Sequence, residues 1–140
     1  MKSYSTSIDI SATAEQVWAA MTQGLQHDPV PFGILKIEGA LALNSRIRLW
    51  SEVDPKRAFA LRVTAFQAPR KMVWQGGLPL GLFKGTRTFT LSATGDKTKF
   101  DMEEVYGGVM SGLIVKTIPD LNPSFEKFAK ALKERAERNE

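Results

Sequence analysis

The feature that most constrains the fold is a long stretch in which the hydrophobic pattern has a period of two. From about Ile34 to Tyr106, apolar and polar side chains alternate in six segments, which are separated by short turn sequences containing Asn, Asp, Gly or Pro. Alternation of this kind predicts strands with one covered face and one solvated face. Because the connections are short, neighbouring strands must be antiparallel, as in a meander. The expected strands are ILKIEGAL, RIRLWSE, RAFALRVTAF, KMVWQG, GTRTFTLSA and KTKFDMEEVY.

One further strand and a short helix precede the meander. The segment YSTSIDI alternates like a strand, and SATAEQVWAAMT follows it with Thr13 and Gln16 at the spacing of a capping box. Val17 and Met21 lie one turn apart, so this second segment predicts a short amphipathic helix. Residues 23–33 contain two prolines and are expected to be mostly loop.

A long amphipathic helix is expected at the C-terminal end. Asn122 before Pro123 is typical of an N-cap followed by proline at the first helical position, and the sequence leaves open whether residues 112–118 continue this helix through a bend at Pro119. The order of elements predicts an α+β fold, in which a long helix lies across one face of an antiparallel sheet. The apolar stripe of the helix consists of Leu121, Phe125, Phe128 and Leu132.

The last two strands of the meander can be placed in register. If Gly95-Asp96 forms a two-residue hairpin loop, every cross-strand pair follows from it. One face is apolar near the turn and must be the covered face. Moving away from the turn, the same face becomes polar. The expected pairs on it are Leu91–Phe100, Phe89–Met102, Arg87–Glu104 and Gly85–Tyr106.

The pair of Arg87 and Glu104 allows two interpretations. At the end of a sheet, fully solvated, it would contribute only about 0–1 kcal/mol to stability. On the floor of an internal pocket, it would orient a ligand, because burying an ion is costly unless the ion is paired and hydrogen-bonded. The pattern alone leaves both interpretations open.

Composition and charge disfavour several other classes of protein. An apolar share of 43% and a charged share of 24% are those of a globular chain. The start MKSYSTSIDI lacks the apolar core of a secretory signal, and no apolar run is long enough for a membrane span. Without cysteine the chain has no disulfides, so a cytoplasmic location is expected.

The charged residues do not indicate nucleic-acid or metal binding. The net charge is +4, and much of it comes from EKFAKALKERAERNE, where both signs alternate as on a solvated helix face. His27 is the single histidine, and the scattered carboxylates have no ligand spacing, so neither a metal nor a cofactor is expected. A carboxylate dyad fails on geometry, because alternation places Glu103 and Glu104 on opposite faces.

In their order along the chain, five segments resemble the START-like (SRPBCC) helix-grip superfamily, specifically its polyketide cyclase/dehydrase-type members. They are ATAEQVWAAMT, GALALNSRIRL, APRKMVWQGGLPLGLFKGTRTFTL, TKFDMEEVYGGVM and FEKFAKALKERAE. The resemblance implies a single START-like ligand-binding domain over residues 1–140, with a curved antiparallel sheet of about six to seven strands around the C-terminal helix. It also implies a cavity for an apolar small molecule between sheet and helix. Relatives often place a second short helix after the first, and the sequence leaves open whether residues 24–33 form one.

The expected ligand-binding residues follow from the hairpin register and from this resemblance. The resemblance matches Glu104, Tyr106 and Trp74 to a carboxylate and two aromatic positions of the family. The segment GGLPLGLFKG (76–85) is expected to be an apolar loop at the open end of the covered face. The expected apolar wall is Trp74, Phe89 and Met102, the polar groups are Arg87, Glu104 and Tyr106, and the entrance is lined by Phe32, Leu78, Leu80, Leu82 and Phe83.

The sequence is compatible with three functions. The leading hypothesis is the binding of a hydrophobic or aromatic small molecule, without catalysis. The second is a cyclase or dehydratase, a lyase or isomerase in which Arg87 stabilises an enolate oxyanion and Glu104 or Tyr106 moves protons. The third is an interaction module of the chaperone-activator kind that uses the apolar loop as a contact surface. A homodimer is left open.

Overall fold

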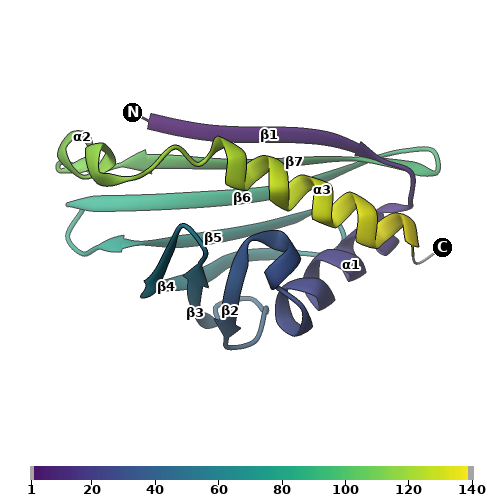
Figure 1. The fold of residues 1–140 in the computed structure, drawn as a ribbon, viewed down its shortest axis with the longest axis horizontal. Coiled ribbons are helices and arrows are strands. Elements are labelled where there is room, and N and C mark those ends of the chain that lie inside the picture. The colour runs from purple at the N-terminus through teal and green to yellow at the C-terminus, as the bar shows by residue number, and fades with distance from the viewer. Residues whose placement is uncertain (1, 139–140) are drawn as a thin grey trace.

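The computed structural model describes residues 2–138, which form one seven-stranded antiparallel sheet with α3 laid across its concave face (Figure 1). The strand order is β1-β7-β6-β5-β4-β3-β2, so the N-terminal strand lies beside the last one. The α+β helix-grip fold is therefore confirmed. The elements are β1 (Lys2–Ile10), α1 (Ala14–His27), η1 (Val30–Phe32), β2 (Ile34–Glu38), β3 (Arg46–Ser51), β4 (Asp54–Gln67), β5 (Lys71–Leu78), β6 (Phe83–Thr94), β7 (Lys97–Gly107), α2 (Ser111–Ile114), η2 (Val115–Thr117) and α3 (Asn122–Arg138).

The β6–β7 hairpin has the register that the sequence predicts. Leu91 opposes Phe100, and Arg87 opposes Glu104. The turn works because Gly95 has a φ of 67°, a left-handed conformation that glycine adopts without steric cost. All four expected pairs on the covered face are present.

The first helix is longer than expected. Its capping box between Thr13 and Gln16 is present, but the helix continues to His27 instead of ending near Thr22. Leu25 extends the buried face of the helix by one more turn, and the burial of that apolar side chain outweighs the breaker signals that follow. Residues 23–33 are thus helical in their first half, and the rest contains only the 3-10 turn η1.

The C-terminal helix has the predicted apolar stripe but begins one residue early. The carbonyl oxygen of Leu121 already accepts a hydrogen bond from the backbone N–H of Phe125, so Leu121 and not Asn122 holds the N-cap position. The side chain of Asp120 accepts from the N–H of Asn122. The preceding elements α2 and η2 end at an extended Ile118, so they are separate from α3.

The segment GGLPLGLFKG is mostly strand and only briefly a loop. Leu78 pairs with Phe83, and residues 79–82 alone form the turn. The glycines permit this because β5 can keep its pairing at Gly77 with a φ of 138°. The expectation of a long loop is wrong, because three of the glycines, Gly76, Gly77 and Gly85, stand within paired strands.

The core fills the space between the concave face of the sheet and helices α1 and α3. Phe128 lies at its centre, with ring centroids 5.0 Å from Phe32, 5.7 Å from Phe89 and 5.9 Å from Phe100. Within residues 2–138, none of the helices has both the length and the apolar character required to cross a bilayer.

Candidate functional site

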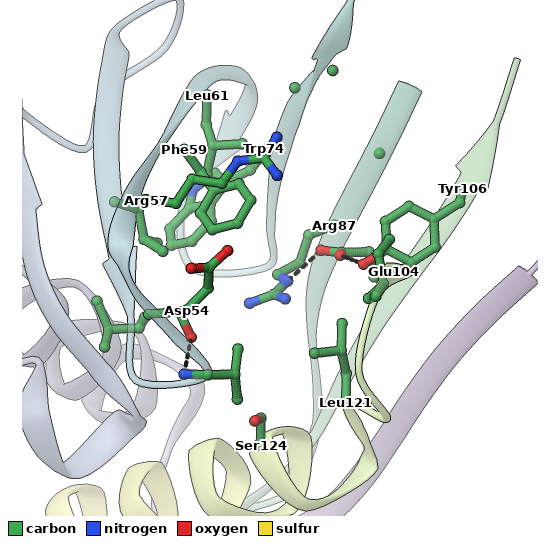
Figure 2. Close-up of a pocket in the computed structure, with 18 of the residues that line it drawn as sticks. Asp54, Arg57, Phe59, Leu61, Trp74, Arg87, Glu104, Tyr106, Leu121 and Ser124 are labelled. Atoms are coloured by element: carbon green, nitrogen blue, oxygen red, sulfur yellow. Dashed lines mark hydrogen bonds and ion pairs between the residues drawn. The ribbon is translucent and has the colours of Figure 1, made fainter. Parts of the chain in front are cut away.

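A cavity of about 550 Å³ lies between the sheet and the first turns of α3, next to the packed core. Gly76 on β5 pairs with Gly85 on β6 there, and both line the cavity. Large residues fill the equivalent space nearer the β6–β7 turn. Figure 2 shows polar groups from β4, β6, β7 and α3 around this space.

Three polar side chains form a hydrogen-bonded chain in the cavity wall. The Nε–H of Arg87 donates to Oε1 of Glu104 over 2.7 Å, and the hydroxyl of Tyr106 donates to Oε2 of the same carboxylate. The side chains of Arg87 and Glu104 are only 20% and 15% exposed. The pair therefore lies half-buried against the cavity and does not have the geometry of a fully solvated pair at a sheet end.

Tyr106 is held as a protonated hydrogen-bond donor. Burial, followed by the negative charge of Glu104, raises the pKa of the Tyr106 hydroxyl far above its usual value. Its ring stacks on Phe83 at 5.7 Å and meets the ring of Tyr4 edge-on at 6.4 Å. At neutral pH the hydroxyl is committed to Glu104 and does not act as a base.

Replacing Tyr106 with phenylalanine is expected to lower the free energy of unfolding by about 1–2 kcal/mol at pH 8, because one hydrogen bond to a charged acceptor is lost. The pKa of Tyr106 is raised by folding, so its contribution is complete below the usual tyrosine pKa of about 10 and is lost as the pH rises above it. Urea unfolding should thus show that the free energies of unfolding of the wild type and Tyr106→Phe differ less at pH 11 than at pH 8. An equal difference at both pH values would contradict this assignment.

Arg87 presents a free edge to the cavity. Its Nε edge is occupied by Glu104, whereas Nη1 and Nη2 have no hydrogen-bond partner among residues 2–138. The guanidinium lies 4.9 Å above the ring of Phe125 and points into the middle of the cavity (Figure 2). A planar cation with four unused N–H groups can bind an oxygen acceptor of a ligand.

The opposite wall carries charged and polar residues that the sequence analysis did not identify. Asp54 and Arg57 come from the start of β4, and Ser124 comes from the first turn of α3. In Figure 2 the carboxylate of Asp54 faces the guanidinium of Arg87 across the cavity. The sequence does contain a sign that Ser124 faces the sheet. Ser124 stands three residues after Leu121 and four before Phe128, so it lies on the apolar stripe of the helix. For β4 no sequence signal showed which residues the curled sheet would bring inward.

Most of the expected ligand-binding residues come together around the cavity, but Phe89, Leu80 and Leu82 do not. Phe89 is buried behind the wall, with its ring 4.7 Å from that of Trp74. Leu80 lies at the tip of the β5–β6 turn, 94% exposed, and takes no part in the wall. Of the other entrance residues, Leu78 lines the cavity and Leu82 does not. The wall includes Phe32, Trp74, Phe83, Arg87, Met102, Glu104 and Tyr106.

No metal-binding group is evident in the part of the chain that the structure describes, since no three His, Asp or Glu side chains come close enough to hold an ion.

Comparisons with known proteins identify the family and the fold. A family model described as "Polyketide cyclase / dehydrase and lipid transport" matches residues 1–137. A comparison with curated protein sequences gives no significant match.

Solved structures share the fold at low sequence identity. Protein MLL2253 from Mesorhizobium loti has a TM-score of 0.73 and 17% identity, over 99% of this chain and 99% of that chain. Norcoclaurine synthase from Thalictrum flavum has a TM-score of 0.67 and 16% identity, over 95% of this chain and 84% of its own. The di-domain ARO/CYC protein BexL has a TM-score of 0.66 and 16% identity, over 98% of this chain and 47% of BexL.

Proposed function

Because the chain belongs to the polyketide cyclase/dehydrase and lipid transport family, we propose that it binds a hydrophobic or aromatic small molecule in the cavity between the sheet and α3. The observation that carries this proposal is the cavity itself. Its volume of about 550 Å³ lies within the range of small-molecule sites. Its wall is mainly apolar, with a small number of polar side chains on two sides, as such sites require for orientation.

The arrangement of the wall suggests how a ligand lies. Phe125, Met102 and Trp74 offer apolar and aromatic surface, and Arg87 stands among them with its Nη edge free. An apolar body would lie against the aromatic rings while one oxygen accepts from the guanidinium. The described residues supply both contacts without a change in the fold.

Filling the cavity should abolish binding. Ser124 lines the cavity from α3, so Ser124→Trp would occupy ligand space, and we expect affinity for any bound probe to fall at least tenfold. Native mass spectrometry and thermal shift with a panel of aromatic compounds and fatty acids would measure this. Glu126→Trp is the matched control, because it adds the same side chain to an exposed position of the same helix. Equal binding by the wild type and Ser124→Trp, or no binding to the wild type, would refute the proposal.

A cyclase or dehydratase is the second candidate, favoured by one observation. The free N–H groups of Arg87 would stabilise an enolate oxyanion in the cavity. The groups that would have to move protons are less suited to that task, because Tyr106 and Glu104 are hydrogen-bonded to each other. For that reason ligand binding without turnover is ranked first.

A further inference from the structure

We propose that the cavity selects a neutral apolar ligand bearing a carbonyl oxygen and discriminates against the carboxylate of the same size. This inference rests on the proposed function and adds the chemical class of the ligand's polar group. It is carried by the balance of charge in the cavity wall and by the way in which Arg87 is already paired.

The charges of the cavity wall cancel. Among the residues that line it, Arg57 and Arg87 are positive and Asp54 and Glu104 are negative, with no lysine or histidine. The empty site therefore has no excess of formal positive charge that would favour an anion. A neutral ligand keeps this balance, whereas a carboxylate ligand would leave one negative charge uncompensated in a half-buried space.

The pairing of Arg87 strengthens this preference. Its charge is already compensated by Glu104, whose Oε1 lies 2.7 Å from Nε. A ligand carboxylate on the Nη edge would be the second carboxylate on one guanidinium, close enough to Glu104 to be repelled by it. A carbonyl oxygen accepts the same N–H groups without adding a charge.

The surroundings of the free edge do not relieve that repulsion. Phe125 lies under the guanidinium at 4.9 Å, so water is excluded from that side. Across the cavity, the carboxylate of Asp54 faces the guanidinium and also repels an anion (Figure 2). Arg57 is exposed, with its guanidinium 4.9 Å from the ring of Phe59, so its charge is largely screened by solvent.

The test compares two matched pairs of probes at pH 7.5, 2-acetylnaphthalene with 2-naphthoate and 2-dodecanone with dodecanoate. Isothermal titration calorimetry with the wild type should show the ketone bound at least tenfold more tightly than the carboxylate. Glu104→Gln removes the competing charge with little change in shape, so the ratio of ketone affinity to carboxylate affinity should fall at least tenfold. Arg87→Met should weaken the ketone at least tenfold.

Glu103→Gln is the matched control for charge. It removes the same charge one residue away, on the opposite face of β7, and should leave the ratio of the two affinities unchanged. The ratio of ketone affinity to carboxylate affinity is measured on the wild type alone, so the proposal can still be tested if Glu104→Gln does not fold. Equal or tighter binding of the carboxylates to the wild type would overturn this inference and leave the proposed function intact. Binding of neither pair would overturn both.

Discussion

Replacing Phe128 with alanine is expected to lower the free energy of unfolding by about 3–5 kcal/mol, the range for deleting a fully buried aromatic ring. Phe128 is 2% exposed, and its ring contacts those of Phe32, Phe89 and Phe100. Those three rings come from η1, β6 and β7, so the substitution weakens the attachment of α3 to three elements at once. Urea unfolding followed by circular dichroism at neutral pH measures the change.

Lys130→Ala provides the control for this experiment, because Lys130 is exposed on the same helix. A surface substitution of this kind should change stability by less than about 0.5 kcal/mol. A loss below about 1 kcal/mol for Phe128→Ala would mean that the surrounding rings collapse into the vacated space. It would contradict the central position given to this side chain.

The second large effect is expected from Gly77→Ala, which should cost about 2–4 kcal/mol through strain and overlap. Gly77 has a φ of 138°, and a Cβ built there would lie 2.3 Å from the carbonyl oxygen of Phe83. The neighbour is backbone of the paired strand β6, so it cannot move aside without breaking the ladder. Thermal and urea denaturation would report the loss.

Two other glycines separate the causes of that effect. A Cβ at Gly81 would meet nothing within 4 Å, but the residue has a φ of 70°. Gly81→Ala should therefore lower the free energy of unfolding only through the left-handed conformation, by about 1 kcal/mol. Gly112→Ala has open space and no positive φ, so no loss is expected. If Gly77→Ala and Gly81→Ala cost the same amount, the close approach to Phe83 would not be the cause.

The fold could be predicted from the sequence because the patterns that indicate its strands and turns are local and occur several times. Period-two alternation defines the strands, and the two-residue Gly95-Asp96 turn fixes the register of β6 and β7, which places Arg87 opposite Glu104. The family resemblance is also confirmed, since the family model spans residues 1–137. The strands and the register of β6 and β7 needed only neighbours in the chain or across one hairpin.

Only part of the candidate site could be predicted from the sequence, because its far wall depends on the curl of the whole sheet. Asp54 and Arg57 reach the cavity only after β3 and β4 have folded over it, and a turn signal such as Asp54-Pro55 says nothing about that distance. The structure differs from the expected place of Leu80 for another reason. An apolar side chain favours contact with the cavity, but the tight β5–β6 turn leaves this side chain in solvent.

Because β1 pairs with β7, the last strand of the chain, the sheet cannot be completed during synthesis until β7 has left the ribosome. Residues 2–10 pair with residues 98–106, and α3 packs against β1 as well. The strands from β2 to β6 can pair with their neighbours as soon as each is made, whereas β1 has no partner until about a hundred residues have followed it. Loop closure over that length is slow compared with hairpin formation. The cavity, whose wall includes residues of β7 and of α3, is therefore the last part of the molecule to take shape during synthesis.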